Sequence, residues 1–215
     1  MSRVTLLIDG REVPASTDEP LLWAALDAGI FIPNLCALRG VFPDGNCRLC
    51  FVGIDGACEP ALSCAVRPED GMVVRTDAPE AVALRRAAFE LLMGAHAPTC
   101  AGCPALETCE LIRIAKRERW PLRTKRFPVR APVARADDRH PAIRIDPERC
   151  VWCNRCVVEC VRVRPADPLL EFARRGPRTV LSTFGGAPLP DGCAECLRCV
   201  AVCPAAGLSR RGGRR

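Results

Sequence analysis

Sixteen cysteines in 215 residues constrain the fold of this chain more than any other feature of its sequence. Fifteen of them, together with one histidine, form four groups with the close spacings of metal ligands: Cys36, Cys47, Cys50 and Cys64; His96, Cys100, Cys103 and Cys109; Cys150, Cys153, Cys156 and Cys160; Cys193, Cys196, Cys199 and Cys203. Thiolate groups of this kind bind zinc or iron–sulfur clusters. Four such groups on so short a chain predict four metal clusters and a role in moving electrons.

The last two groups share the spacing C-x2-C-x2-C-x3-C, which is that of bacterial ferredoxins with two cubane clusters. In that arrangement three cysteines of a run bind one cluster and the fourth binds the other. We therefore expect Cys203 to join the first three cysteines of the earlier run, and Cys160 to join those of the later run. Val161 departs from the pattern, because the later run continues into Pro204. A zinc site has no use for a third cysteine at this spacing.

The first group, CALRGVFPDGNCRLC with a distant fourth cysteine, resembles the plant-type two-iron arrangement, although its first gap is longer. Gly40, Gly45 and Asn46 in the long loop favour tight turns. Cys58 also lies within range and is interpreted as a spare thiol. The alternative is that Cys58 replaces Cys64 as the fourth ligand.

The second group, HAPTCAGCPALETC, places a histidine four residues before a C-x2-C pair. His96 is therefore predicted to replace one thiolate, which makes the cluster less negative and raises its potential. A three-cysteine site, or one completed by an outside ligand, is the alternative. His140 has no cysteine near it in sequence and is predicted to be a solvated loop residue.

The order of these groups resembles the N-terminal iron–sulfur region of the complex I large iron–sulfur subunit, of NAD-dependent formate dehydrogenases and of iron-only hydrogenases. In size the chain is most similar to the small iron–sulfur diaphorase subunit of NAD-reducing nickel–iron hydrogenases. The flanking segments SCAVRPEDGMVVRTD and ADDRHPAIRIDPERCVWCNRC agree with this resemblance. It implies one 2Fe-2S cluster and three 4Fe-4S clusters. It also implies relay of electrons between a flavin subunit that oxidises NAD(P)H and a catalytic hydrogenase or formate dehydrogenase subunit.

Short apolar runs around Asp9 and Gly10 predict a hairpin. The segment EPLLWAALDAGI predicts an amphipathic helix with Leu22, Trp23, Leu26 and Ile30 on one face, and PEAVALRRAAFELLMGA predicts a longer helix. A short helix, ALETCELIRIAKRE, is expected to carry Cys109.

These elements predict an α+β fold of three small modules. Residues 1–78 are expected to form a β-grasp domain of the plant-type 2Fe-2S kind. Residues 79–142 are expected to form a small helical 4Fe-4S domain with one histidine and three cysteine ligands, followed by a basic connector. Residues 143–215 are expected to form a bacterial 2x4Fe-4S ferredoxin domain. Domains this small need staples such as clusters, because each can bury only a small apolar core.

Several other classes of protein are disfavoured by the sequence. The start of the chain lacks the apolar region of a signal peptide, and no stretch is long and apolar enough to span a membrane. Reduced thiolates then predict a cytoplasmic protein rather than a disulfide scaffold. The net charge of +6 allows nucleic-acid binding, but stacking aromatics are scarce, so no nucleic-acid partner is predicted. No G-x-G-x-x-G motif follows a strand, and no catalytic site is predicted on this chain.

Two other functions stay open from the residues alone. The chain can be a free ferredoxin that shuttles between enzymes, or a zinc-binding interaction module. A stable complex with a partner distinguishes the relay subunit from a free ferredoxin. The brown colour of iron–sulfur protein distinguishes it from a zinc-binding module, which is colourless.

Overall fold

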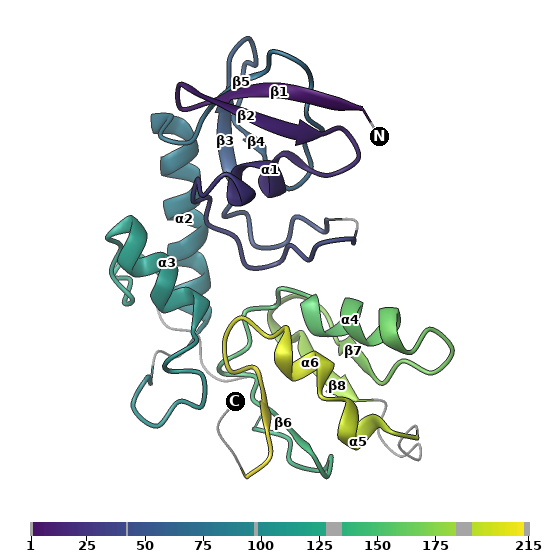
Figure 1. The fold of residues 1–215 in the computed structure, drawn as a ribbon. Coiled ribbons are helices and arrows are strands. Elements are labelled where there is room, and N and C mark those ends of the chain that lie inside the picture. The colour runs from purple at the N-terminus through teal and green to yellow at the C-terminus, as the bar shows by residue number, and fades with distance from the viewer. Residues whose placement is uncertain (1, 42, 97–98, 128–134, 184–190, 213–215) are drawn as a thin grey trace. The chain divides into compact units, whose positions relative to one another are not determined.

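The computed structural model describes residues 2–41, 43–96, 99–127, 135–183 and 191–212, and it divides into two compact units, Met1–Glu90 and Leu91–Arg215 (Figure 1). Both units contain helices and strands, which confirms the predicted α+β class. The predicted connector and the insertion between the two ferredoxin runs lie partly outside the described residues, at 128–134 and 184–190. Within the described ranges, none of the helices has the length and apolar character needed to cross a bilayer.

The first unit is built on a mixed five-stranded sheet in the order β2-β1-β5-β3-β4. Its strands are β1 (Arg3–Ile8), β2 (Arg11–Ser16), β3 (Phe51–Ile54), β4 (Ala61–Leu62) and β5 (Val73–Arg75). β1 and β2 form the predicted hairpin, whose turn residues Asp9 and Gly10 have φ of 50° and 77°. Positive φ at both positions is what a two-residue hairpin turn of type I′ requires. β5 pairs parallel with β1 and antiparallel with β3, so the chain crosses over before it completes the sheet.

One helix covers this sheet. α1 (Leu21–Asp27) buries three side chains: Leu21, Leu22 and Ala25. Trp23 and Leu26, predicted on one face with Leu22, are partly buried and pack against the same core, whereas Ile30, predicted on that face too, lies beyond the end of the helix. The Arg39 guanidinium lies 4.8 Å from the centre of the Trp23 ring, within the range of a cation–π contact. The core is formed by α1 and the inner face of the sheet.

A long helix, α2 (Pro79–Ala95), follows the sheet as predicted and ends directly before His96. A narrow stripe along it is buried, at positions four residues apart: Ala81, Arg85, Phe89 and Met93. This spacing is that of a single helix face. Arg85 joins the stripe because its guanidinium donates to the backbone oxygen of Thr76, at 2.6 Å.

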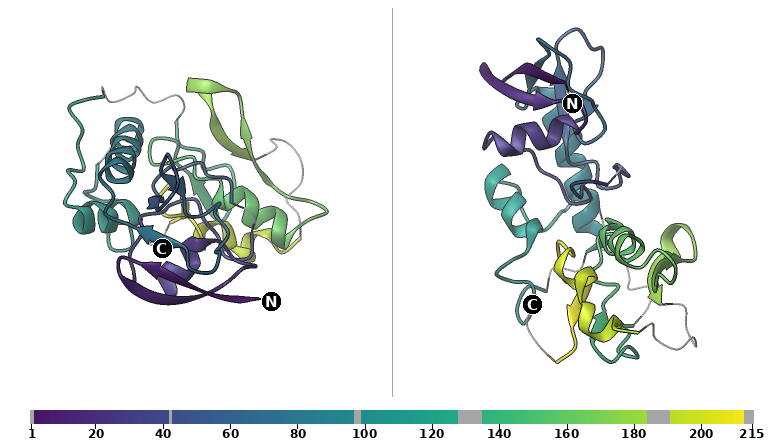
Figure 2. Two further views of the ribbon diagram at one scale, coloured as in Figure 1. Left: turned by 90° about the horizontal axis from the view of Figure 1, so that it is seen from above. Right: turned by 45° about the vertical axis from the view of Figure 1, so that its right-hand side comes forward.

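The second unit combines short helices with two small sheets (Figure 2). Its elements are α3 (Glu110–Glu118), β6 (Ile143–Ile145), α4 (Arg155–Val163), β7 (Leu170–Ala173), the 3-10 turn η1 (Gly176–Arg178), β8 (Val180–Thr183), α5 (Cys193–Cys196), α6 (Arg198–Ala201) and β9 (Leu208–Arg210). β6 pairs antiparallel with β9, so the segment ahead of the first ferredoxin run lies beside the segment after the second. β7 and β8 form an antiparallel hairpin inside the insertion.

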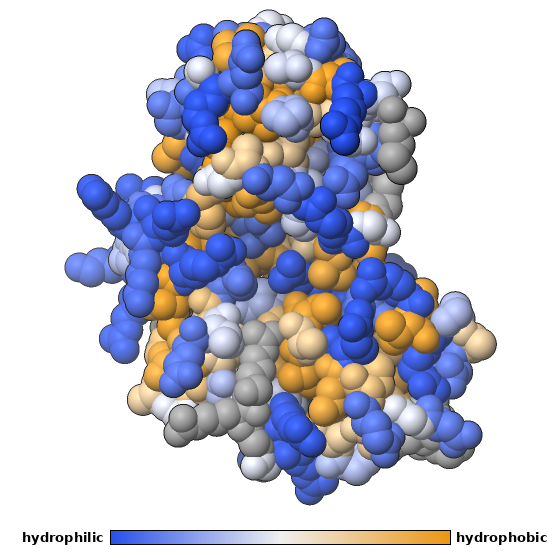
Figure 3. Space-filling model, in the orientation of Figure 1, coloured by the Kyte–Doolittle hydropathy of each residue, from blue (hydrophilic) through white to orange (hydrophobic). Residues whose placement is uncertain are grey.

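The packing of α3 and of the two ferredoxin runs differs. α3 buries Leu111, Ile114 and Ala115 on one side, and hydrophilic side chains gather over its outer face (Figure 3). The core around α4 and α6 instead mixes aliphatic residues with cysteines: Ile143, Ile145, Cys156, Cys160, Leu169, Leu170, Leu181, Val200, Cys203 and Leu208. Ligand-type side chains therefore occupy positions that a larger domain fills with apolar residues alone.

Candidate metal centres

The first group of cysteines comes together in the loops around β3. All four side chains are buried, whereas Cys58 is exposed. The Sγ atoms of Cys36 and Cys47 lie 3.3 Å apart. Hydrogen bonding from Cys36, joined by backbone N–H groups, lowers the pKa of Cys47 to about 6. The structure thus places Cys64, and not Cys58, with the other three.

Cys50 and Cys64 form a second pair in the same place. The hydrogen bond between them raises the pKa of Cys50 and lowers the pKa of Cys64, because one sulfur donates and the other accepts. The backbone N–H of Leu35 also donates to Cys47 Sγ at 3.4 Å. Donors of this kind stabilise the thiolate, which is the form that binds metals.

The backbone around the first group takes up unusual conformations. Gly40 and Gly45 have φ of 75° and 64° in the long loop, as their sequence positions predicted. Arg48, between the close pair of cysteines, has φ of 54°, which costs a non-glycine residue about 1–2 kcal/mol. Such strain is typical of functional loops, and only the structure locates it at Arg48.

The second group lines one cavity. Its wall includes His96, Cys100, Cys103 and Cys109. His96 is buried, and its Nδ1 has no hydrogen-bond partner among the described residues. Burial lowers the pKa of His96, which favours the neutral imidazole that ligates metals. An unpartnered ring nitrogen beside three thiols fits a metal centre with one histidine ligand.

Cys109 differs slightly from its predicted position. It is the N-cap of α3 rather than a residue within the helix, which begins at Glu110. Burial raises the pKa of the Cys109 thiol, while the backbone N–H groups at the start of α3 oppose that effect. The backbone N–H of Glu110 donates to the oxygen of Pro204 at 2.9 Å, so the turn after the last cysteine lies against this centre.

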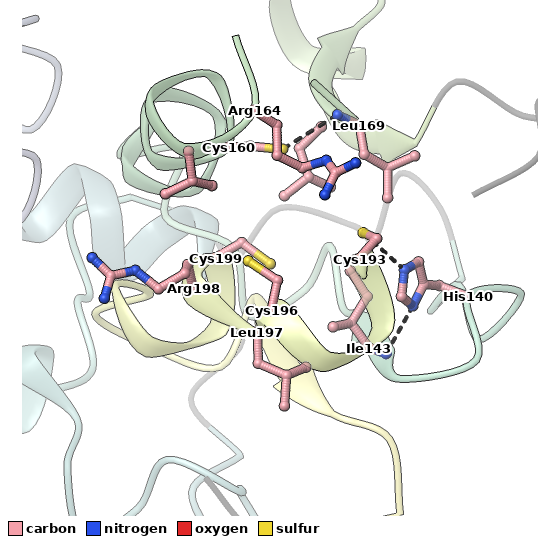
Figure 4. Close-up of a pocket in the computed structure, with 12 residues that line it drawn as sticks. His140, Ile143, Cys160, Arg164, Leu169, Cys193, Cys196, Leu197, Arg198 and Cys199 are labelled. Atoms are coloured by element: carbon pink, nitrogen blue, oxygen red, sulfur yellow. Dashed lines mark hydrogen bonds between the residues drawn. The ribbon is translucent and has the colours of Figure 1, made fainter. Parts of the chain in front are cut away.

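The two ferredoxin runs come together in a crossed arrangement, in which the fourth cysteine of each run lies with the first three cysteines of the other. One cavity is lined by Cys160 and by three cysteines of the later run, Cys193, Cys196 and Cys199 (Figure 4). Cys203 lies instead with the earlier run. Burial, together with the charge of nearby Cys203, raises the pKa of Cys150 and of Cys153 to about 12.

Each crossed cysteine also receives a backbone hydrogen bond. The N–H of Leu169 donates to Cys160 Sγ at 3.2 Å, and the N–H of Leu208 donates to Cys203 Sγ at 3.4 Å. Hydrogen bonds to ligand sulfurs are among the features that set cluster potentials. The two runs are therefore alike in this hydrogen bond as well as in spacing.

Two matching backbone positions add to this likeness. Asn154 and Leu197 each follow the second cysteine of a run, and their φ values are 67° and 47°. Leucine rarely adopts this left-handed region, so the local turn is imposed by the surrounding structure. Each of these residues is the N-cap of the helix that carries the third cysteine of its run, α4 or α6.

Ligands of one metal ion converge on a point, whereas those of a cluster surround several atoms. Among the residues in the described ranges, no three His, Cys, Asp or Glu side chains converge on a point that could hold a single metal ion. The candidate centres are instead marked by the cysteine pairs of the first group and by the cavities that the other groups line.

Comparison with known proteins gives the family of the first module. Residues 1–79 match the model of the 2Fe-2S iron-sulfur cluster binding domain. The match covers the sheet, α1 and all four cysteines of the first group, and it stops where α2 begins.

Relatives extend the likeness over the whole chain. The chain is 33% identical over 213 residues, 95% of its length, to the NADPH-Fe(3+) oxidoreductase subunit alpha of Geobacter sulfurreducens, and spans 24% of that protein. It is 29% identical to the NAD-reducing hydrogenase HoxS subunit gamma of Cupriavidus necator, covering 94% of this chain and 84% of that one. The chain thus spans about a quarter of the first relative and most of the second.

A solved structure shows the same fold. One chain in the crystal structure of an NAD+-reducing [NiFe]-hydrogenase in the H2-reduced state aligns with a TM-score of 0.83 and 26% identity. The alignment covers 97% of this chain and 88% of that chain. The resemblance inferred from the cysteine order is therefore confirmed.

Beyond the 2Fe-2S domain, the structure corrects the prediction for His140. The residue is buried, not solvated, with 6% of its surface exposed. Its Nε2 lies 3.6 Å from Cys193 Sγ (Figure 4). Burial lowers the pKa of His140. The two residues are 53 positions apart in the sequence, which explains why the sequence contains no signal for this contact.

Sequence reasoning also missed Glu159, which precedes the crossed cysteine of the earlier run. Its side chain is fully buried and forms ion pairs with Arg162, at 2.7 Å, and Arg198, at 2.9 Å. Burial alone raises the pKa of Glu159, but the two guanidinium groups outweigh it and hold the pKa below its usual value. Glu159 therefore connects α4 with α6.

Proposed function

We propose that the chain binds one 2Fe-2S cluster and three 4Fe-4S clusters and relays electrons within a multi-subunit oxidoreductase. The observation that carries this proposal is the crossed grouping of the two ferredoxin runs around separate centres. Such grouping is specific to a pair of neighbouring cubane clusters. When bound, these clusters accept and release single electrons.

The residues of the 2Fe-2S domain suit a two-iron centre. Four buried cysteines form two hydrogen-bonded pairs, Cys36 with Cys47 and Cys50 with Cys64. We infer that each pair holds one iron, which fits two irons with four thiolate ligands. The N–H of Leu35 then stabilises the sulfur of Cys47.

The other three ligand sets fit four-iron centres. His96 with Cys100, Cys103 and Cys109 forms the set that contains an imidazole. The two crossed sets are Cys150, Cys153, Cys156 with Cys203, and Cys193, Cys196, Cys199 with Cys160. These assignments support the proposed modules at 1–78, 79–142 and 143–215, since each module contains whole ligand groups.

The relatives indicate the kind of partner. Their names describe subunits of an NAD-reducing hydrogenase and of an NADPH-Fe(3+) oxidoreductase. We therefore infer a flavin subunit that oxidises NAD(P)H on one side, and a catalytic hydrogenase or formate dehydrogenase subunit on the other. This chain's own residues hold the centres in place and set their potentials.

The test is the metal content of anaerobically purified protein, with low-temperature EPR after dithionite reduction. About fourteen irons and fourteen sulfides per chain, with separate two-iron and four-iron signals, are expected. Zinc in place of iron overturns the proposal. Co-purification with flavin and catalytic subunits is expected as well, and a protein that stays alone with its partners present is a free ferredoxin.

A further inference from the structure

His140 lies in the loop before β6, where both of its ring nitrogens face identifiable groups. Its Nδ1 accepts the backbone N–H of Ala142 at 3.0 Å and that of Ile143 at 3.1 Å. A nitrogen that accepts two N–H groups carries no proton of its own. The proton of the neutral ring is therefore on Nε2.

That proton faces a candidate cluster ligand. Nε2 lies 3.6 Å from Cys193 Sγ, and Figure 4 shows the ring between this sulfur and the backbone of Ile143. His140 and Cys193 line the same cavity as Cys160, Cys196 and Cys199. The backbone N–H groups of Ala142 and Ile143 thus fix the ring on its Nδ1 side, and the Nε2–H donor points at the Sγ of Cys193.

We propose that His140 is a positioning residue that donates a hydrogen bond to the Cys193 thiolate and raises the reduction potential of the cluster at that set. This inference rests on the proposed function, because it requires a cluster there. A hydrogen bond draws charge from the ligand sulfur and stabilises the reduced cluster, which carries one more negative charge. The fixed tautomer means that the donor is present without any change in the charge of the ring.

Two variants separate this role of His140 from a purely structural role in its turn. His140→Asn keeps a short acceptor for the backbone N–H groups two and three residues on, as asparagine does in turns. It does not reach Cys193, so only the hydrogen bond to sulfur is lost. His140→Ala loses both functions. All three side chains are neutral, so a shift in potential is not an effect of charge.

The experiment is an EPR-monitored redox titration of the full-length, cluster-loaded protein. The relevant four-iron signal is the one that Cys196→Ser changes. In His140→Asn and His140→Ala we expect wild-type iron content, a lower midpoint potential for this signal, and unchanged potentials for the other clusters. A wild-type potential in His140→Asn, with a shift only in His140→Ala, overturns the inference and assigns the residue to the turn alone.

A second measurement uses the unaltered chain and so does not depend on the variants folding. Protein labelled with 15N-histidine should show a weak nitrogen coupling to this reduced cluster in pulsed EPR, beside the strong coupling from His96 at its own cluster. Absence of the weak coupling contradicts the hydrogen bond. If the wild type takes up no four-iron clusters at all, the proposed function itself fails.

Discussion

At the residue scale, burial distinguishes the four cysteines proposed as ligands in the first group from Cys58. Cys64 has 1% of its surface exposed and pairs with Cys50, whereas Cys58 is exposed. We predict that Cys64→Ser abolishes the two-iron EPR signal and that Cys58→Ser, its matched control, leaves the signal at full intensity. Dithionite-reduced spectra of both variants provide the measurement. The reverse result would mean that Cys58 is the fourth ligand.

His96 supplies the test of the mixed ligand set. A thiolate in place of the imidazole adds one negative charge to the cluster, which disfavours its reduction. His96→Cys should therefore keep the iron content and lower the midpoint potential of that four-iron cluster. A redox titration followed by EPR measures this shift, with the two-iron signal as an internal reference. An unchanged potential would show that His96 does not bind the cluster.

Gly207 has a steric reason to be glycine. A Cβ built there would lie 2.9 Å from the Cα of Cys150, and backbone atoms cannot move aside as a flexible side chain can. We predict that Gly207→Ala destabilises the second unit by about 1–3 kcal/mol, as overpacking does elsewhere. The midpoint of urea-induced cluster loss measures the effect. Wild-type resistance to urea would show that the turn at Cys150 can shift freely.

At the scale of elements, Glu159 joins α4, which carries Cys160, to α6, which ends two residues before Cys203. Its carboxylate is fully buried, while the side chains of Arg162 and Arg198 remain 45% and 55% exposed. Removing both arginines leaves a buried charge unpaired, which costs about 3–5 kcal/mol, whereas removing Glu159 leaves two cations that water can solvate. The interaction is therefore asymmetric.

This asymmetry gives a prediction about variants. The double variant Arg162→Ala with Arg198→Ala should lose its clusters at a lower urea concentration than Glu159→Gln, although it leaves Glu159 in place. Absorbance of the bound clusters during unfolding is the measurement. Equal sensitivity of the double and Glu159→Gln variants would contradict the buried-charge argument.

Elements with local signals were the predictable part of the fold. The hairpin at Asp9 and Gly10, and the helix at 79–95, follow from turn chemistry and helical periodicity within one segment. Ligand spacing likewise predicted which cysteines the structure brings into each set. The pairing of β6 with β9 and the contact of His140 with Cys193 were not predictable, because they join distant segments whose meeting depends on the whole fold.

At the scale of the whole chain, the two units differ in what fills their cores. The first unit buries an aliphatic core between its sheet and α1, in which cysteines are a minority. The core of residues 143–212 includes three cysteines among ten buried members, with two more packed against it. Apolar burial stabilises a fold without a metal, whereas thiol-rich cores depend on the energy of ligation.

The units should therefore respond differently to loss of metal. We predict that anaerobic removal of iron with a chelator leaves slow amide exchange in β1, β2 and β5, while exchange in α4, α6 and β9 approaches that of an unfolded chain. Hydrogen–deuterium exchange read by mass spectrometry measures both regions in one sample, and reconstitution with iron and sulfide should restore protection in the second. Equal protection of both regions in the apo protein would mean that residues 143–212 fold on their apolar contacts alone. The clusters would then contribute nothing to the folding of this module. We predict instead that they replace the part of the apolar core that so short a chain cannot supply.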